Sequence, residues 1–192
     1  MKKIKVVDSH TGGEPTRIIV GGVPSFTGKT LIEQVEILKN EYDYIRTASV
    51  NEPRGSDVIV GGLLCEPTRE GCSAAVIFFN NNKYLGMCVH GTMGLVVTLN
   101  HLGLISLGKH LIETPVGIVE TELLKDGEVV VKNIPSYCYK SDVELDVTDY
   151  GVIKGDIAYG GNWFFLTDEF KEPIEKNNIG KLRDISINIK KS

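Results

Sequence analysis

A cysteine, a histidine and several glycines stand close together in the run from Tyr84 to Gly94. Residues 74–79, before this run, are apolar and strand-forming, and apolar residues recur at helical spacing after it. We therefore expect Cys88 at the entrance of a helix. Unpaired N–H groups and the positive end of the helix dipole favour an anion there, so they lower the pKa of a thiol and can hold a carboxylate.

Cys88 and His90 suit more than one kind of chemistry. Cys88 is either a reactive acid and base or a buried, inert thiol, because free cysteine is among the most buried residue types. His90 either binds a substrate and orients Cys88, or caps the helix. We predict no metal site, because zinc needs three or four ligands at suitable spacing and no companion pair stands near. A cysteine hydrolase would need a separate histidine base, and His90 is too close in sequence to favour one.

Four motifs resemble, in the same order, those of the proline racemase and hydroxyproline epimerase family. They are Asp8-Ser-His-Thr-Gly-Gly-Glu-Pro-Thr-Arg17, Glu52-Pro-Arg-Gly55, Met87-Cys-Val-His-Gly91 and Gly155-Asp-Ile-Ala-Tyr-Gly-Gly-Asn-Trp-Phe-Phe165. The first and last are most similar to those of the 4-hydroxyproline 2-epimerases. Family members have two pseudo-symmetric lobes, each with one cysteine at a helix N-terminus, and this chain resembles the N-terminal lobe only.

The resemblance implies an isomerase that works without pyridoxal phosphate, metal or any other cofactor. It implies Cys88 as a catalytic acid and base at the α-carbon of proline or 4-hydroxyproline. The backbone N–H groups of Val89, His90 and Gly91 are implied to bind the substrate carboxylate. The partner is then a small imino acid, with neither nucleic acid nor a membrane involved. The family's second cysteine motif, an Asp-Arg-Ser-Pro-Cys-Gly-Thr type of run, has no counterpart in residues 160–192.

Two alternatives stay open beside the epimerase or racemase. One is a trans-3-hydroxyproline dehydratase of the same family, a branch in which the second cysteine is typically replaced. The other is a truncated, inactive lobe that self-associates, because an apolar interface without its partner tends to find another. A homodimer in which two Cys88 thiols face each other is a variant of this reading.

Val89 and Ser56 depart from the family's pattern. Val89 stands where the family usually has glycine, and Ser56 follows Pro-Arg-Gly where histidine is common. A β-branched residue disfavours positive φ. Either the backbone at Val89 therefore has a negative φ, or the valine narrows the pocket.

Strand-like runs outnumber helices, which favours an α+β fold with mixed and antiparallel strands. We expect strands at residues 4–7, 17–20, 58–64, 73–80, 111–114, 119–124, 128–132, 152–159 and 162–166. Asp126-Gly127 favours a hairpin turn. One helix is expected from Leu31 to Ile45, with Thr30 and Glu33 as its capping box, and a second begins near His90. A central helix wrapped by strands would match the family's lobe, which resembles that of diaminopimelate epimerase.

The chain as a whole has ordinary globular composition. Of its 192 residues 42% are hydrophobic, and the formal net charge is -4, so we exclude a nucleic-acid binder as first choice. No segment approaches the ~20 apolar residues that cross a bilayer, and irregularly spaced cysteines without a secretory signal indicate the cytoplasm. We expect one lobe over residues 1–167, and over 168–192 the start of a second lobe or an interdomain tail.

Several other polar residues are expected to be structural. His10 lies beside two glycines and suits a tight turn. Arg54 is expected to pair with a nearby acid rather than to act in catalysis. Cys65, Cys72 and Cys138 lack a helix entrance and are expected to be ordinary thiols.

Overall fold

The structure is a computed structural model that describes residues 3–192. The chain divides into two compact units, one that ends at Ile134 and one over Pro135–Ser192. The expected boundary between residues 167 and 168 lies inside the second unit. The assignment of residues 168–192 to the start of a second lobe stays a prediction.

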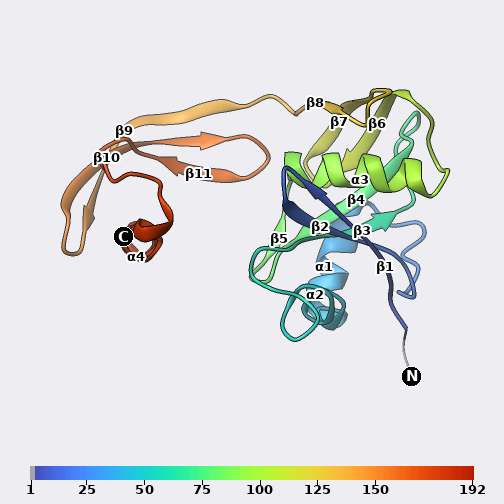
Figure 1. Cartoon of the computed structure of the whole chain (residues 1–192), viewed down its shortest axis with the longest axis horizontal. Coiled ribbons are helices and arrows are strands. Elements are labelled where there is room, and N and C mark those ends of the chain that lie inside the picture. Colours follow the sequence, from blue (N-terminus) through green and yellow to red (C-terminus); the bar gives the residue numbers. More distant parts are fainter. Residues whose placement is uncertain (1–2) are drawn as a thin grey trace. The chain divides into compact units, whose positions relative to one another are not determined.

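An eight-stranded mixed sheet forms the frame of the first unit (Figure 1). Its order is β1-β2-β3-β4-β6-β7-β8, with β5 paired to β4. The pairs β2–β3 and β4–β6 are parallel and the others antiparallel. The strands are β1 Lys5–Thr11, β2 Glu14–Gly21, β3 Val60–Cys65, β4 Ala74–Phe79, β5 Tyr84–Leu85, β6 Gly108–Thr114, β7 Gly117–Leu123 and β8 Val129–Lys132. The α+β class, the strands predicted in this unit and the hairpin at Asp126-Gly127 are confirmed.

Strand β4 separates two hydrophobic cores, because all six of its residues are buried. Phe78 belongs to the core that helix α3 (Val89–His101) covers on one face of the sheet. Phe79 belongs to the core on the other face, under α1 (Leu31–Glu41) and α2 (Tyr44–Val50). Successive side chains of a strand point to opposite faces, so a strand between two cores needs an unbroken apolar run. Burial of each large apolar side chain contributes ~1.5–3 kcal/mol.

Two glycines let α3 lie close to the sheet. A Cβ added to Gly94 would lie 2.8 Å from Thr16 of β2, and one added to Gly91 would lie 2.8 Å from the ring of Phe78. Non-bonded carbon atoms pack at about 3.5–4.0 Å, so a larger residue at either position would push the helix outward. The glycines therefore set how closely the entrance of α3 approaches β2.

Two helix starts follow the sequence pattern. The Thr30 hydroxyl accepts a hydrogen bond from the Glu33 N–H at 3.3 Å, and the Glu33 carboxylate accepts one from the Thr30 N–H at 2.8 Å. This reciprocal pair is the predicted capping box of α1. The helix predicted from about His90 is also present, with Val89 as its first residue.

The first helix ends earlier than its apolar pattern predicts. A single helix up to Ile45 is wrong, because α1 ends at Glu41 and Tyr42 leaves the helical conformation with a φ of −131°. Asp43 then pairs with Arg46 at 2.8 Å across the first turn of α2. This ion pair favours a new helix start over continuation of the old one.

The second unit holds a three-stranded antiparallel sheet in the order β11-β10-β9. Its elements are β9 Tyr137–Val147, β10 Gly151–Tyr159, β11 Trp163–Leu166, the short 3₁₀ helix η1 Lys176–Asn178 and α4 Ile179–Lys191. The strands predicted at 152–159 and 162–166 are confirmed. Strand β9 and helix α4 were not predicted, because polar residues dominate both segments and dilute their apolar period. Helix α4 packs on β9 through few apolar side chains, of which Ile185 is buried.

Candidate active site

Cys88 caps the N-terminus of α3, where the short strand β5 and a turn lead into the helix. Its backbone is extended, with φ −145° and ψ 111°, and its Sγ accepts a hydrogen bond from the Gly91 N–H at 3.3 Å. The Cys88 carbonyl accepts from both the N–H and the hydroxyl of Thr92, at 2.9 and 2.8 Å. The predicted position of the thiol at a helix entrance is therefore confirmed.

Burial raises the pKa of the Cys88 thiol above its ordinary value. The Gly91 N–H lowers this pKa, the negative charge of Glu14 adds to the increase, and the His90 N–H again lowers it. The N–H groups of the helix entrance therefore lower the pKa as expected, but the net pKa of the thiol is raised. Loss of water around the thiolate outweighs the N–H groups, so Cys88 keeps its proton at neutral pH.

His90 is held by strand β2. Its Nε2 lies 3.0 Å from the Glu14 carbonyl oxygen and 3.1 Å from the Thr16 hydroxyl. Its Nδ1 lies 3.9 Å from the Glu14 carboxylate. His90 thus stands in the first turn of the helix that Cys88 caps, with two neighbours from the first motif of the chain.

Glu14 and Thr16 were not predicted as neighbours of the candidate site. They lie 76 and 74 positions before His90, and no spacing rule connects residues so far apart. The only signal in the sequence was that the motif carrying both residues resembles a family motif. The sheet brings them to the helix entrance, because β2 runs beneath the first turns of α3.

The three residues after Cys88 adopt helical geometry. Val89 is the first residue of α3, and the residue is 38% exposed. Its backbone therefore has a helical, negative φ, which settles the backbone alternative raised by the valine. The N–H groups of His90 and Gly91 are directed at the Cys88 sulfur. The binding of a carboxylate by Val89, His90 and Gly91 stays a prediction.

Arg17 ties the first motif to the Glu52-Pro-Arg-Gly55 segment. Its guanidinium forms a bidentate ion pair with the Asp8 carboxylate, with both N···O distances at 2.7 Å. It also donates hydrogen bonds to the backbone carbonyls of Ser49 and Arg54. Asp8 correspondingly raises the pKa of the Arg17 guanidinium. The Arg54 side chain donates to the Ala48 carbonyl at 3.1 Å, instead of pairing with an acid as expected. These contacts hold the loop after α2 against β2.

His10 has the predicted turn role. Its Nδ1 accepts a hydrogen bond from the Gly13 N–H at 3.2 Å, across the hairpin between β1 and β2. Gly12 and Gly13 have φ values of +60° and +95°, a conformation that favours glycine.

The other three cysteines are free thiols. Burial and the nearby Glu113 carboxylate raise the pKa of Cys65 to about 12. Burial is also the main cause of a raised pKa at Cys72, while Cys138 is exposed. None of the three caps a helix in the described part of the chain.

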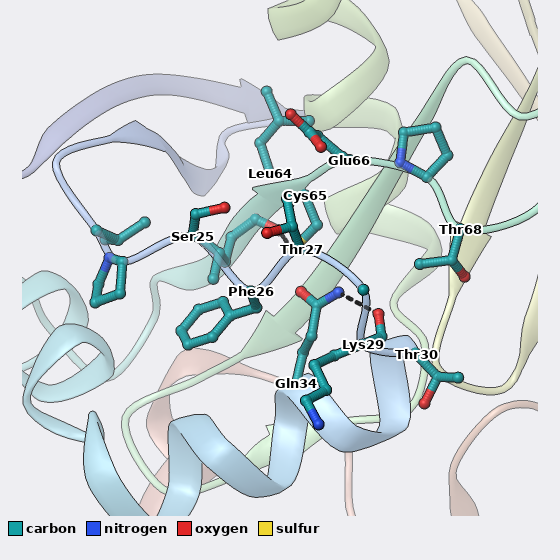
Figure 2. Close-up of a pocket in the computed structure, with 15 residues that line it drawn as sticks. Ser25, Phe26, Thr27, Lys29, Thr30, Gln34, Leu64, Cys65, Glu66 and Thr68 are labelled. Atoms are coloured by element: carbon teal, nitrogen blue, oxygen red, sulfur yellow. Dashed lines mark hydrogen bonds between the residues drawn. The ribbon is translucent and has the colours of Figure 1, made fainter.

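A cavity of about 530 Å³ lies away from Cys88 (Figure 2). Residues 23–30 and 63–68 line it together with Gln34 of α1, so it opens on the face of the sheet that carries α1. Figure 2 shows the Gln34 amide donating to the Lys29 carbonyl, at 3.0 Å. The Cys88 site is on the α3 face, and we do not assign this cavity to it.

Residues 3–192 include no cluster of three or more His, Cys, Asp and Glu side chains suited to a metal ion. Over the same residues, no helix combines the length and apolar character needed to cross a membrane.

The mixed sheet, with a thiol at the entrance of its buried helix, defines an α+β lobe of the epimerase type. A hydroxyproline epimerase from Agrobacterium vitis, solved with bound trans-4-OH-L-proline, matches 94% of this chain over 56% of its own, with a TM-score of 0.87 and 25% identity. A probable proline racemase from Agrobacterium radiobacter K84, solved with bound carbonate, matches with the same coverage and TM-score at 28% identity.

Sequence comparison identifies the family. The family described as proline racemase matches residues 6–192. Over all 192 residues the chain is 50% identical to the 4-hydroxyproline 2-epimerase of Acinetobacter baumannii, and it covers 62% of that protein. Over 182 residues, 95% of this chain, it is 53% identical to the 4-hydroxyproline 2-epimerase of Burkholderia cenocepacia and covers 59% of it. The chain belongs to the proline racemase family, and it spans about 60% of the length of these relatives.

Proposed function

We propose that this chain carries one half of the acid–base machinery that epimerises 4-hydroxyproline, or racemises proline, at the α-carbon. The observation that carries the proposal is the Cys88 thiol at the entrance of α3, with the Gly91 N–H on its sulfur. The names of the relatives support the substrate class, and so does the trans-4-OH-L-proline bound to the Agrobacterium vitis protein. The proposal involves no cofactor.

The reaction requires one proton acceptor and one proton donor on opposite faces of the α-carbon. A thiolate on one face takes the α-proton, and the electron pair of the broken C–H bond moves into the carboxylate group. A thiol on the other face returns a proton to carbon, which inverts the centre. Because burial keeps Cys88 protonated, Cys88 is the donor in one direction and the acceptor in the reverse direction.

The entrance of α3 supplies the recognition of the substrate carboxylate. The positive end of the helix and the N–H groups of Val89, His90 and Gly91 favour an anion beside the thiol. A bound carboxylate competes with the Cys88 sulfur for these N–H groups. Substrate binding therefore raises the thiol pKa further, which keeps the donor form in place.

The second proton carrier is a group that does not belong to the Cys88 site of the same chain. The part of the relatives that this chain does not span is one source, and a second copy of the chain is another. In the second case two copies of the lobe, related by a two-fold axis, would present their two Cys88 thiols to the same substrate molecule. Exposed aromatic residues on the small sheet of the second unit, Tyr137, Tyr139 and Trp163, favour self-association.

Proton NMR of trans-4-hydroxy-L-proline and L-proline in heavy water tests the proposal. We expect loss of the α-proton signal with the chain present, and a loss of that exchange by on the order of 100-fold or more in Cys88→Ser. Cys138→Ser is the matched control, because Cys138 is an exposed thiol far from α3 in sequence. Absence of exchange in a sample of the unaltered chain that sedimentation shows to be a dimer would contradict the proposal.

Two further results of this experiment, and a third with trans-3-hydroxyproline as the substrate, separate the alternatives. Appearance of the epimer indicates a working donor and acceptor, and sedimentation of the same sample shows whether a dimer supplies them. Exchange without epimer indicates one working face only. Loss of water from trans-3-hydroxyproline would indicate the dehydratase instead.

We propose the cytoplasm as the location, because all four cysteines are free thiols.

A further inference from the structure

Strand β2 places two oxygen atoms on one nitrogen of His90. The Glu14 carbonyl oxygen is 3.0 Å from Nε2 and the Thr16 hydroxyl oxygen is 3.1 Å from it. Both oxygens come from the same strand, two residues apart, so they approach the ring from one side. The imidazole is therefore held by the sheet and not by its own helix.

The chemistry of the Glu14 carbonyl decides which nitrogen carries the ring proton. A carbonyl has no proton to give and only accepts hydrogen bonds. Nε2 must therefore carry a proton and donate it in a hydrogen bond to the Glu14 carbonyl. The Thr16 hydroxyl oxygen accepts from the same N–H group, so the hydrogen bond is bifurcated. In the neutral ring Nδ1 then keeps its lone pair, and the Glu14 carboxylate lies 3.9 Å from it.

The position of the Thr16 hydroxyl is itself fixed by packing. Thr16 is 1% exposed and pairs in register with Ser9 of β1 and Val60 of β3. Its side chain fills the space that Gly94 leaves open on α3, where a Cβ would come within 2.8 Å of it. A β-branched side chain has few χ1 choices, so the hydroxyl has little freedom to turn away from His90.

We propose that Thr16 is a positioning residue: its buried hydroxyl, together with the Glu14 carbonyl, fixes the orientation of the His90 ring in the first turn of the helix that Cys88 caps. The effect of Thr16 on turnover rests on the function proposed above. Its effect on the His90 ring does not, because the hydrogen bonds exist in the chain without substrate.

Nitrogen-15 NMR of the histidine rings tests the proposal without turnover. The chain has four histidines, so the spectrum of His90→Gln assigns the His90 signals by subtraction. In the unaltered chain we expect separate Nδ1 and Nε2 signals of the Nε2–H tautomer. In Thr16→Val, which keeps the shape and removes the hydroxyl, the Nε2 signal should shift, because the Nε2–H group loses one of its two acceptors.

Thr16→Ser is the matched control, since it keeps the hydroxyl and removes only a methyl group. We expect it to retain the His90 signals of the unaltered chain. If Thr16→Val leaves the His90 signals unchanged while circular dichroism shows the variant folded, the proposal is overturned. The same holds if Thr16→Ser changes them as much as Thr16→Val does.

Turnover provides the second readout. We expect Thr16→Val to lower kcat/KM for α-proton exchange roughly 3- to 10-fold, the usual effect of one hydrogen bond, and Thr16→Ser to restore it. If a dimeric sample of the unaltered chain shows no exchange but Thr16→Val still alters the His90 signals, the proposed function fails and the positioning role stands. If exchange occurs and the His90 signals do not respond to Thr16, only the positioning role fails.

Discussion

Opposed influences act on the Cys88 sulfur, and their balance sets which form of the thiol is present. Burial against the core under α3 and the Glu14 carboxylate disfavour the thiolate, while two backbone N–H groups favour it. Removing water from a charge is costly unless hydrogen bonds replace it fully. At this site two N–H groups do not compensate, so the neutral thiol prevails. Glu14 has a second role through its carbonyl, which holds His90.

Replacement of Glu14 with Gln should lower the pKa of Cys88, because it removes the one negative charge that raises it. The rate of alkylation by iodoacetamide follows the thiolate fraction. We therefore expect the midpoint of its pH dependence, measured on the Cys88 peptide by mass spectrometry, to move to lower pH in Glu14→Gln. The carbonyl of residue 14 is retained, so the contact to His90 is preserved.

Glu41→Gln is the control for that experiment, because it removes an exposed charge from the end of α1 on the other face of the sheet. We expect the Cys88 midpoint in Glu41→Gln to equal that of the unaltered chain. The shift in Glu14→Gln should also shrink in high salt, since the Glu14 carboxylate is exposed. An unchanged midpoint in Glu14→Gln at low salt would show that the two groups do not interact.

At the scale of elements, the contact between α3 and β2 determines the geometry of the candidate site. Cys88 and His90 belong to the helix, and their neighbours Glu14 and Thr16 belong to the strand. The distance between the two elements depends on Gly94, whose missing side chain accommodates Thr16. Any change in that distance alters the approach of β2 to His90.

Gly94→Ala should destabilise the chain by ~1–3 kcal/mol, because overpacking at the contact with Thr16 exceeds the ~1 kcal/mol gain in helix propensity. Chemical denaturation followed by far-UV circular dichroism measures the change. Gly180→Ala is the matched control, since this helical glycine in α4 has open space around it and should show the propensity gain alone. A Gly94→Ala variant as stable as Gly180→Ala would contradict the close contact.

At the scale of the whole molecule, both large hydrophobic cores lie within the first unit. The core under α3 contains residues of α3 and of the strands β2 to β8. The core under α1 and α2 contains residues between Ile4 and Tyr84. The second unit has only a few buried apolar side chains, among them Val147, Ile153 and Ile185. The stability of the candidate site therefore resides in the first unit.

We expect a fragment of residues 1–134 to fold on its own and to keep the Cys88 alkylation midpoint of the full chain. Far-UV circular dichroism should show a cooperative thermal transition for it. A fragment of residues 1–103 is the matched control: it keeps Cys88 and α3 but lacks β6 to β8. The missing strands β6 and β7 supply Ile112, Val119 and Leu123 to the core. That shorter fragment should be unfolded, and an unfolded 1–134 fragment would contradict the prediction.

Features that depend on neighbouring residues were determined by the sequence alone. The capping box at Thr30, the turn at Asp126-Gly127, the buried strand before Cys88 and the helix after it each rest on contacts within a few positions along the chain. Local propensity and hydrophobic period report such contacts directly. The family also followed from the sequence, because its motifs lie in contiguous runs.

Features that depend on distant residues were decided only by the tertiary structure. Helix α4, which packs on β9, lies where the apolar pattern gave no element. The partners of His90 lie 74 and 76 residues before it in the chain. The pKa of Cys88 rises because the folded core excludes water from the sulfur. Burial is a property of the packed chain, whereas the local motif predicts only the helix entrance. Burial raises the pKa of the Cys88 thiol, and the N–H groups of the helix entrance lower it.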